Sequence, residues 1–310
     1  MHARFLVPLG RRRTRLVLAV AISGAAIGLG LPGGTTPGDA ADRFVAGRPA
    51  TERAPLDGEQ AARVLAVART SRVRLGLPEA ADVRVDRVTD RFSGTTYDEV
   101  TTSDAAGRSL HVQRFDEHGQ LVGAVAFGWQ AAGGRHLRDA DSARARGLSL
   151  AADLGLGVSG PPDVRQEPDA TGWTIAWPRV VDGIPVLGDG VRVDLWPDGR
   201  VHAVVRSERP LAPGPSSVLD EAAARQRATE TLGNLFGSRA GEVAIVTIGL
   251  GWVAPNGAFD PTAPDAPDPT LRLAWIAEAR TSGALAEGLR AVKVFIDAGS
   301  GAVLGGDVLR

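Results

Sequence analysis

The segment VFIDAGSGAVL (residues 294–304) contains two apolar runs separated by a short polar turn. Residues 294–296 predict the end of one β-strand, and residues 302–304 predict the start of the next. Between them, Asp297 can accept hydrogen bonds from the amides of the turn, and Gly299 and Gly301 can adopt the positive φ that tight hairpins need. The segment therefore predicts a β-hairpin.

Two earlier segments, FDEHGQLV (115–122) and WPDGRVHAV (196–204), repeat this pattern of an apolar strand end, Asp and Gly, and an apolar strand start. Each of the three turns follows a helical pattern and several strands of alternating polarity. Three such turns, each in the last position of its unit, predict an internal triplication. Each unit is expected to be one helix packed on an antiparallel β-sheet, so the predicted fold class is α+β with tandem units.

Each unit opens with a helix signal. Asp57 is a candidate N-cap with Gln60 three positions later, which is the spacing of a capping box. The second helix is expected to begin near Asp139, and the third begins after Ser217 and Asp220. The strands predicted from alternating apolar residues are 82–88, 96–102 and 110–115 in the first unit, 173–177, 191–195 and 201–205 in the second, and 243–253, 271–279 and 291–296 in the third.

The N-terminus has the composition of an export signal. Five arginines within the first 15 residues precede an apolar run from residue 16 to residue 31. A basic region followed by a short apolar core is typical of a secretory signal peptide, and the run is shorter than the roughly 20 residues of a membrane-spanning helix. We therefore expect a secreted or extracytoplasmic protein. The alternative is an uncleaved N-terminal anchor, which would make the protein membrane-attached and associated with the cell envelope.

Composition excludes several function classes. The chain has no cysteine, which excludes disulfides, thiolate nucleophiles and thiolate metal sites. Its formal net charge is −1, and the arginines beyond the N-terminal region are dispersed among acidic residues. Such a surface has no electrostatic basis for binding nucleic acid.

The second and third units resemble a known family. DGIPVLGDGVRVDLWPDGRV (182–201) resembles the propeptide segment of thermolysin-type metalloproteases, and LRLAWIAEAR (271–280) with VKVFIDAGSGAVL (292–304) resembles the PepSY domain that follows that segment. The resemblance covers residues 140–310, and it extends to residues 57–138 only through the order of helix and hairpin. The residues that match the family motifs, in structural roles, are Asp182, Gly183, Pro185, Val186, Asp198, Gly199, Trp275, Asp297, Ala298 and Gly301.

This resemblance defines an expected domain organisation and function. The expected parts are a signal peptide (1–31), a flexible linker (32–56), a divergent PepSY-like unit (57–138), a propeptide or PepSY-like unit (139–212) and a PepSY domain (213–310). The family implies a stand-alone, secreted form without a catalytic domain, whose partner is on another chain. Such a protein would inhibit or chaperone an extracytoplasmic protease, with a metalloprotease as the class that the resemblance implies, or it would modulate envelope assembly.

Catalytic and metal-binding patterns are absent from the sequence. There is no H-E-x-x-H zinc motif, and His111 and His118, on a strand and its turn, are not spaced to bind one ion, so the histidines are expected to be solvated surface residues. Ser300 is expected to be a turn former, and GLGVSG (155–160) a helix end instead of a phosphate loop. Asp260, Asp265 and Asp268 lie in a Pro-rich spacer. We therefore expect no enzyme activity, cofactor or metal.

The tryptophans supply the remaining candidate site. Trp173, Trp177 and Trp275 are in register with apolar strand neighbours and are expected in the core. Trp196 instead alternates with Arg192 and Asp194, on the opposite side of its strand. Trp196 and Arg192 are therefore the candidate partner surface, with packing against the next unit as the alternative for Trp196. An alternative function is that of a cell-wall or glycan-binding module that uses exposed Trp196.

Overall fold

The computed structural model describes residues 51–79, 81–90, 95–128, 136–167, 172–259 and 270–309. The predicted signal peptide and residues 32–50 of the predicted linker lie outside them. The described residues form three α-helices, which are α2 (Gly58–Leu75), α3 (Ala140–Leu154) and α4 (Glu221–Phe236), and two 3₁₀ helices, η2 (Gly237–Glu242) and η3 (Gly283–Glu287). None of these helices is long and apolar enough to cross a membrane.

The described strands occur as β1 before the first described helix and as a run of four strands after each α-helix. They are β1 (Thr51–Pro55), β2 (Asp82–Asp90), β3 (Thr96–Ser103), β4 (Ser109–Phe115), β5 (Leu121–Ala126), β6 (Asp163–Gln166), β7 (Trp173–Val181), β8 (Ile184–Leu195), β9 (Val201–Ser207), β10 (Val243–Val253), β11 (Arg272–Thr281), β12 (Ala291–Asp297) and β13 (Val303–Leu309). The result is a mixed α/β fold that consists mostly of antiparallel sheet.

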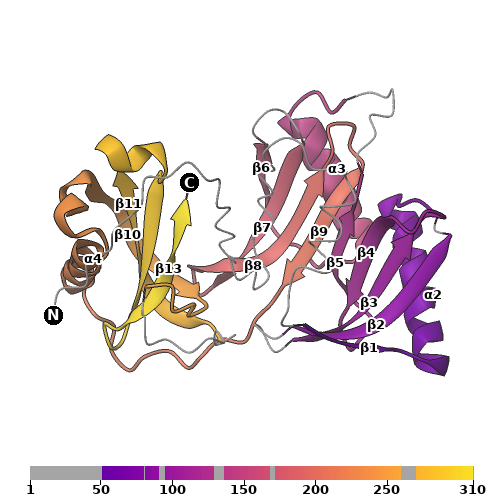
Figure 1. The fold of residues 1–310 in the computed structure, drawn as a ribbon, viewed down its shortest axis with the longest axis horizontal. Coiled ribbons are helices and arrows are strands. Elements are labelled where there is room, and N and C mark those ends of the chain that lie inside the picture. The colour runs from indigo at the N-terminus through magenta and orange to yellow at the C-terminus, as the bar shows by residue number, and fades with distance from the viewer. Residues whose placement is uncertain are drawn as a thin grey trace, which may run out of the picture.

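Each helix is followed by four consecutive antiparallel strands. We call α2 with β2–β5 the first segment, α3 with β6–β9 the second segment, and α4 with β10–β13 the third segment. The order of strands is β1-β2-β3-β4-β5-β9-β8-β10-β11-β12-β13, with β7 on the other side of β8 and β6 beyond β7. In Figure 1 the third segment lies on the left and the first on the right, with β8 between them.

The first two segments share one sheet and one core. Their last strands, β5 and β9, pair antiparallel, so that the two meanders become continuous. Alternate residues of the shared sheet point to one face, where α2 and α3 contact each other and bury them. Gly147 allows α3 to approach β7 closely, because a Cβ there would lie 2.9 Å from Ile175 Cγ2. Phe115, Leu150, Ile175 and Leu195 are among the largest side chains in this core.

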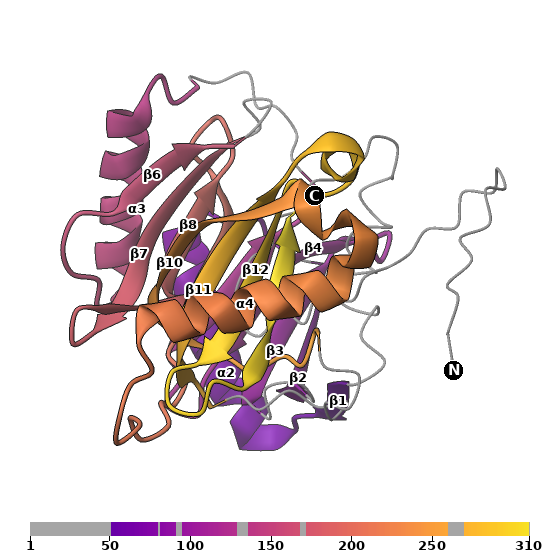
Figure 2. The ribbon, with the colours of Figure 1, turned by 90° about the vertical axis from the view of Figure 1, so that its left-hand side faces the viewer.

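The third segment has its own sheet and helix. Figure 2 shows α4 running across one face of strands β11–β13. Ala228 and Leu232 of α4 pack on Ala277, Val294 and Ile296 of the sheet. No helix of the described residues covers the opposite face. It carries a smaller apolar cluster made of Val253, Ala274, Phe295 and Leu304, with Leu187 and Ile276 packed against it.

Strand β8 joins the two sheets. Its C-terminal part pairs with β7 and β9, and its N-terminal part pairs with β7 and, in parallel, with β10 at Val186 and Trp252. Gly190 marks the position where β9 ends, with φ 122°. A Cβ at Gly190 would lie 2.2 Å from the carbonyl oxygen of Trp177, so only glycine fits here without a backbone shift.

The three predicted hairpins are present between the last two strands of each segment. In the first, the amide of Asp116 donates to Gln120 O, and Asp116 Oδ1 accepts from the amides of His118 and Gln120. In the third, Asp297 Oδ1 accepts from the amides of Gly299 and Ser300.

The hairpin of the second segment has the same backbone pattern with a different residue in first position. The amide of Trp196 donates to Arg200 O, as Asp116 does to Gln120 O, and Asp198 Oδ1 accepts from the Arg200 amide. Trp196 therefore occupies the backbone position of Asp116. The tight turn between β7 and β8 is also as expected, because Asp182 and Gly183 both have positive φ.

In the second and third segments the last hairpin docks on the chain that leads into the helix. The amide of Leu137 donates to Pro197 O, two residues before the N-cap Asp139. The amide of Leu219 donates to Ala298 O, one residue before the N-cap Asp220. The side chains of both N-caps accept a hydrogen bond from the helix, whereas the side chain of Asp57, the N-cap of α2, makes no capping hydrogen bond.

Two sequence expectations need correction. The predicted flexible linker extends too far, because Thr51–Pro55 form β1 and pair with Asp86–Asp90 of β2. The sequence expectation also omitted β6, a four-residue strand that pairs with Trp173–Ala176. Both strands are short and rich in polar residues, so no alternation of apolar residues marks them. Their positions are determined by the backbone of the strand beside them.

We predict that Gly190→Ala lowers the free energy of unfolding by about 2 kcal/mol or more, because the methyl group would be forced against a carbonyl oxygen and φ would become strained. The control is Gly214→Ala, since a Cβ there has no heavy atom within 4 Å. Urea denaturation followed by circular dichroism measures both. Equal stability of the two variants would show that β8 tolerates a side chain at position 190.

Candidate functional surfaces

Of the predicted partner surface, Trp196 lies in the hairpin turn between β8 and β9, and Arg192 lies on β8. Trp196 is half-buried and stacks on His202 of β9, with ring centroids 4.0 Å apart and an interplanar angle of 28°. This contact is made within the second segment. Burial, assisted by the positive charge of Arg192, lowers the pKa of His202 to about 4, so this ring is neutral at physiological pH.

A polar cluster adjoins this stack on the face of the sheet that the helices do not cover. Thr174 Oγ1 lies 2.6 Å from Glu167 Oε1 and 2.7 Å from Asp194 Oδ1, and Arg192 Nη2 lies 3.1 Å from Asp194 Oδ2. A hydroxyl has one proton, so Thr174 donates to one carboxyl group at a time, and the other contact requires a protonated carboxyl. Burial raises the pKa of Asp194 above its usual value, and the attraction of Arg192 opposes this only in part.

A second buried ionic cluster lies on the same face in the first segment. Glu99 is 1% exposed and accepts hydrogen bonds of 2.7 Å from Arg53 of β1 and from Arg114 of β4. Burial alone would raise the pKa of Glu99, but the two guanidinium groups outweigh it and hold this pKa below its usual value. The sequence analysis missed this cluster, because its residues are far apart in sequence and are brought together only by strand pairing.

A third cluster surrounds Asp189, whose side chain is fully buried between Gly188 and Gly190. Asp189 Oδ1 accepts from Ser207 Oγ and from Arg209 Nε, and Oδ2 accepts from the Arg209 amide and from Arg179 Nη1. This carboxylate connects β7, β8 and the end of β9. The string GDG between two apolar strand patterns was the available sequence signal for it.

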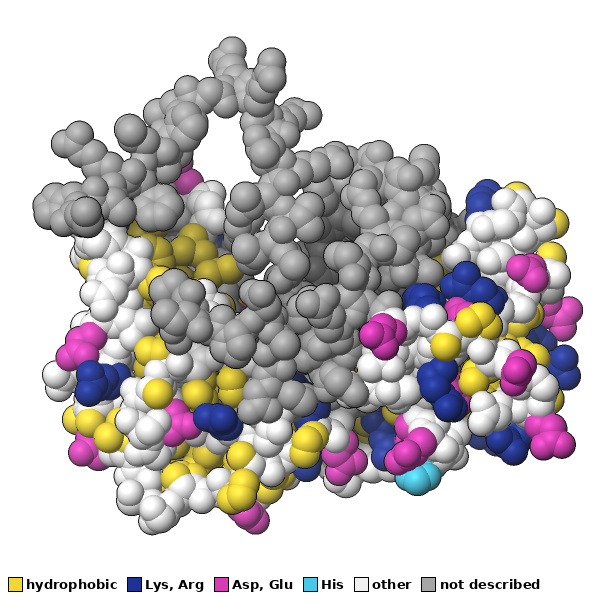
Figure 3. All heavy atoms as spheres, turned by 60° about the horizontal axis from the view of Figure 1, so that its bottom comes forward, with side chains coloured by type: hydrophobic (Ala, Val, Ile, Leu, Met, Phe, Trp, Pro, Cys, Tyr) yellow, Lys and Arg dark blue, Asp and Glu magenta, His cyan; other side chains and the backbone are white. Residues whose placement is uncertain are grey.

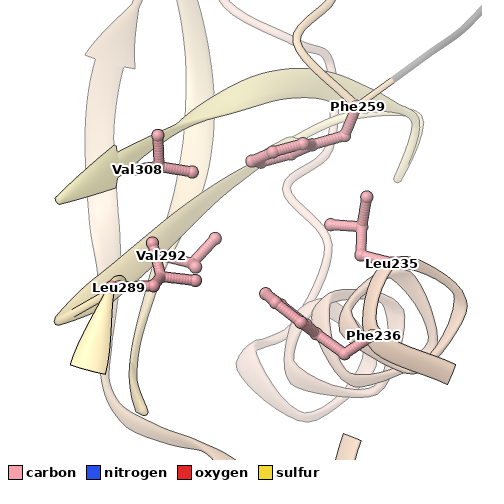
Figure 4. Close-up of a pocket in the computed structure, with 7 residues that line it drawn as sticks. Leu235, Phe236, Phe259, Leu289, Val292 and Val308 are labelled. Carbon is pink, nitrogen blue, oxygen red and sulfur yellow. The ribbon is translucent and has the colours of Figure 1, made fainter. Parts of the chain in front are cut away.

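The third segment contains an apolar pocket of about 350 Å³. Figure 4 shows Leu235 and Phe236 from the end of α4 on one side, with Leu289, Val292 and Val308 across from them and Phe259 above. Its lining has no charged side chain among the described residues. On the face shown in Figure 3, hydrophobic side chains are frequent on the left, over the third segment, and charged side chains are more frequent on the right.

The expectation of solvated surface histidines is wrong for His202, which is half-buried against Trp196, and for His111. The side chain of His111 is fully buried, its Nε2 lies 3.2 Å from Pro78 O, and burial lowers its pKa to about 4. His118 and His136 are exposed, as expected for surface histidines. In the part of the chain that the structure describes, no group of three or more histidine and carboxylate side chains could hold a metal ion.

Most of the other residues singled out in the sequence have structural positions in strands, turns or helix ends. Trp173 and Trp177 are buried, and Trp275 is partly buried and donates its indole N–H to Leu219 O. Pro185 and Val186 open β8, and Gly155 ends α3 with a left-handed conformation. Ser300 donates to Asp297 within the hairpin turn. Asp260, Asp265 and Asp268 lie outside the described residues.

Comparison with known proteins finds similarity to solved structures at low sequence identity. No protein-family model matches the sequence, and no curated protein matches it. The chain is similar to the C-terminal domain of YpeB from Bacillus megaterium, with a TM-score of 0.36 and 11% sequence identity. The match covers 83% of this chain and 100% of that chain. This level of similarity assigns neither a family nor a function.

We predict that Glu99→Gln lowers the free energy of unfolding by about 3 kcal/mol at pH 7, because it removes the buried negative charge that Arg53 and Arg114 both contact. The folded-state pKa of Glu99 lies below the unfolded value of about 4.3, so its contribution is present above that pH and disappears as the pH falls through the folded pKa. The difference between wild type and variant should therefore shrink in strong acid.

The matched control for this experiment is Glu79→Gln. Glu79 pairs with Arg72, but its side chain is 87% exposed, so the change should cost about 0.5 kcal/mol or less. Urea midpoints between pH 2 and pH 7 measure both variants. A Glu99→Gln protein as stable as Glu79→Gln at pH 7 would contradict a structural role for the ionic cluster.

Proposed function

We propose that this chain is a secreted, non-catalytic protein built from PepSY-like repeats, which binds another extracytoplasmic protein. The partner class that the family resemblance favours is a protease, which the chain would inhibit or chaperone. Modulation of envelope assembly is the alternative within the same class of function. The proposal includes no reaction catalysed by this chain.

The observation that carries the proposal is the shared docking of the last hairpin in the second and third segments. In both, a leucine just before the helix N-cap, Leu137 or Leu219, donates its amide to the second residue of the turn, Pro197 or Ala298. These are the segments that carry the family-motif residues. A contact repeated at corresponding positions supports their origin as repeats of one unit, as does the recurrence of one helix and four strands.

The first segment supports the same origin less closely. It has the helix, the four strands and the Asp116 turn, but Leu56 donates its amide to Val85 O of β2 instead of to the last hairpin. We propose that residues 57–138 are a divergent repeat, in which the residue before the helix N-cap forms its backbone hydrogen bond with β2 and not with the last hairpin. Gly119 of that hairpin still lies near α2, since a Cβ there would be 3.8 Å from Val67 Cγ2.

The test uses the secreted form of the chain and a secreted zinc metalloprotease of the same cells. We expect the purified chain to slow hydrolysis of a fluorogenic peptide by that protease, or to raise the refolding yield of the denatured protease, with saturation at a fixed stoichiometry. Bovine serum albumin at equal concentration is the control. No change in either rate or yield at a large excess of the chain would reject the protease version of the proposal.

A second candidate function is cell-wall or glycan binding. The observation that favours it is the half-buried aromatic pair of Trp196 and His202 beside the polar groups of Glu167, Thr174 and Arg192. Glycan sites combine an aromatic platform with nearby polar groups that can hydrogen-bond sugar hydroxyls.

Retention on insoluble cell wall tests this candidate. If Trp196 is the stacking platform, Trp196→Ala should reduce binding by about tenfold, and Trp196→Phe should keep most of it because an aromatic ring remains. Circular dichroism establishes that both variants fold. Equal retention of wild type and Trp196→Ala would exclude Trp196 as a glycan platform.

A further inference from the structure

The outer side of β10 is largely unpaired. On one side β10 pairs with β11 along its whole length, from Val243 to Val253. On the other side, within the described residues, its one ladder partner is β8, and that pairing is confined to Trp252. Figure 2 shows β10 between β8 and β11. The edge from Val243 to Leu250 is therefore available to another strand.

The backbone direction of this edge follows from the hydrogen bonds of β11. The Ala298 amide donates to Leu273 O and the Thr281 amide donates to Arg290 O, so the odd-numbered residues of β11 direct their backbone groups away from β10. Backbone groups alternate along an antiparallel strand, so the even-numbered residues face β10. Two of these even-numbered residues, Glu278 and Ile276, pair with Thr247 and Gly249 of β10, whose backbone groups therefore face β11. The residues between these, Ile248 and Leu250, consequently direct N–H and C=O outward.

The other outer edges of the sheet are protected against pairing. β1 has five residues that include a glutamate, an arginine and a proline, and β6 has four residues that include an aspartate and an arginine. On β13, the Asn256 amide donates to Leu304 O, and the Asn256 side chain pairs with both the N–H and the C=O of Gly306. Short length, charge, proline and covering loops are the usual protections of edge strands.

Among the residues that the structure describes, β10 has none of these four protections, and its one irregularity is a bulge at Val246. Its sequence, VAIVTIGLGWV, contains neither a charged residue nor proline over 11 residues. Val246, at a bulge in the strand, is 47% exposed. Gly249 borders open space, since a Cβ there would have no heavy atom within 4 Å. A long, apolar and uncharged edge strand is a template for an added strand.

The same molecule shows what occupies this position elsewhere. In the first segment, the strand that follows the helix is β2, and its outer edge is covered by β1, an added antiparallel strand. β10 is the strand that follows the helix in the third segment, and its edge lacks such a strand among the described residues. An extended polypeptide is therefore the occupant that the fold itself places at this position.

We propose that the outer edge of β10, from Val243 to Leu250, binds an extended segment of a partner protein as an added β-strand. This proposal rests on the proposed function and names the binding mode of the partner. The segment would place apolar side chains beside Ile245, Ile248 and Leu250 on the α4 side of the sheet. On the other side it would place a bulky side chain over the open space at Gly249, and it would carry no charge opposite the strand.

The experiment uses a short synthetic peptide in which valine and threonine alternate between terminal lysines. In the free protein, the outward amides of Ile248 and Leu250 should exchange with deuterium faster than the inward amides of Thr247 and Gly249. Saturating peptide should slow exchange of the outward amides by at least about tenfold, because these groups become hydrogen-bonded. Unchanged exchange at saturating peptide would overturn the proposal.

Edge-blocking variants give the second measurement. Val246→Lys and Thr247→Lys place a charge on exposed positions of the edge and should weaken peptide binding by at least about tenfold. The control is Val73→Lys on α2, which makes the same change at a side chain that is 70% exposed and remote from β10, and it should bind within about twofold of wild type. Thermal melts establish folding of all three variants.

The outcomes separate this proposal from the proposed function. If wild type and Val246→Lys bind the metalloprotease equally, the edge assignment is wrong and the proposed function stands. If wild type binds the peptide at the edge but no protease, the protease partner is wrong and the edge stands as a peptide site. A concentration-dependent dimer that Val246→Lys abolishes would assign the edge to a second copy of the chain and overturn the partner assignment.

Discussion

The buried carboxylate of Asp189 holds together the part of β8 that connects the two sheets. It accepts hydrogen bonds from Arg179, from Ser207 and from both the backbone and the side chain of Arg209. These contacts join β7, β8 and the chain that leaves β9 toward α4. Within the described residues β8 is the strand that pairs in both sheets, so the course of its backbone on either side of Gly190 sets where the third segment lies relative to the other two. A charged group is well suited to this place because it accepts four hydrogen bonds from two separate parts of the chain, Arg179 on β7 and Ser207 with Arg209 at the end of β9.

Two buried carboxyl groups on the helix-free face of the shared sheet, Glu99 and Asp194, have different partners and different pKa shifts. Glu99 stays ionised, because Arg53 and Arg114 supply two guanidinium groups that compensate for its lost hydration. Asp194 has weaker compensation, and burial raises its pKa. The first arrangement ties β1 and β4 to β3 and stabilises the pairing of strands. The second leaves a group of polar side chains beside an aromatic stack, which is an arrangement suited to recognition.

The proposed function and the open strand edge are physically consistent with each other. Binding by strand addition uses a strand edge whose backbone groups bond to water in the free protein and to the partner strand in the complex. Three outer edges of the sheet are short, charged or covered, whereas β10 presents a long uncharged edge. Keeping one edge open carries a risk of aggregation, and the bulge at Val246 limits that risk because it disrupts the regular spacing that a second identical edge would require.

The sequence by itself determined the elements that depend on neighbouring residues. The three Asp and Gly turns, the helix starts at Asp139 and Asp220, the Asp182–Gly183 turn and the strand Val243–Val253 could all be predicted, because backbone conformation and alternation are local properties. Tertiary structure alone decided the pairing of β5 with β9, the addition of β1, the sharing of β8 and the burial of His111. It also decided the ionic clusters and the open edge of β10. These features join residues that are distant in sequence, and their energy depends on which backbone groups and charges meet after the strands have paired.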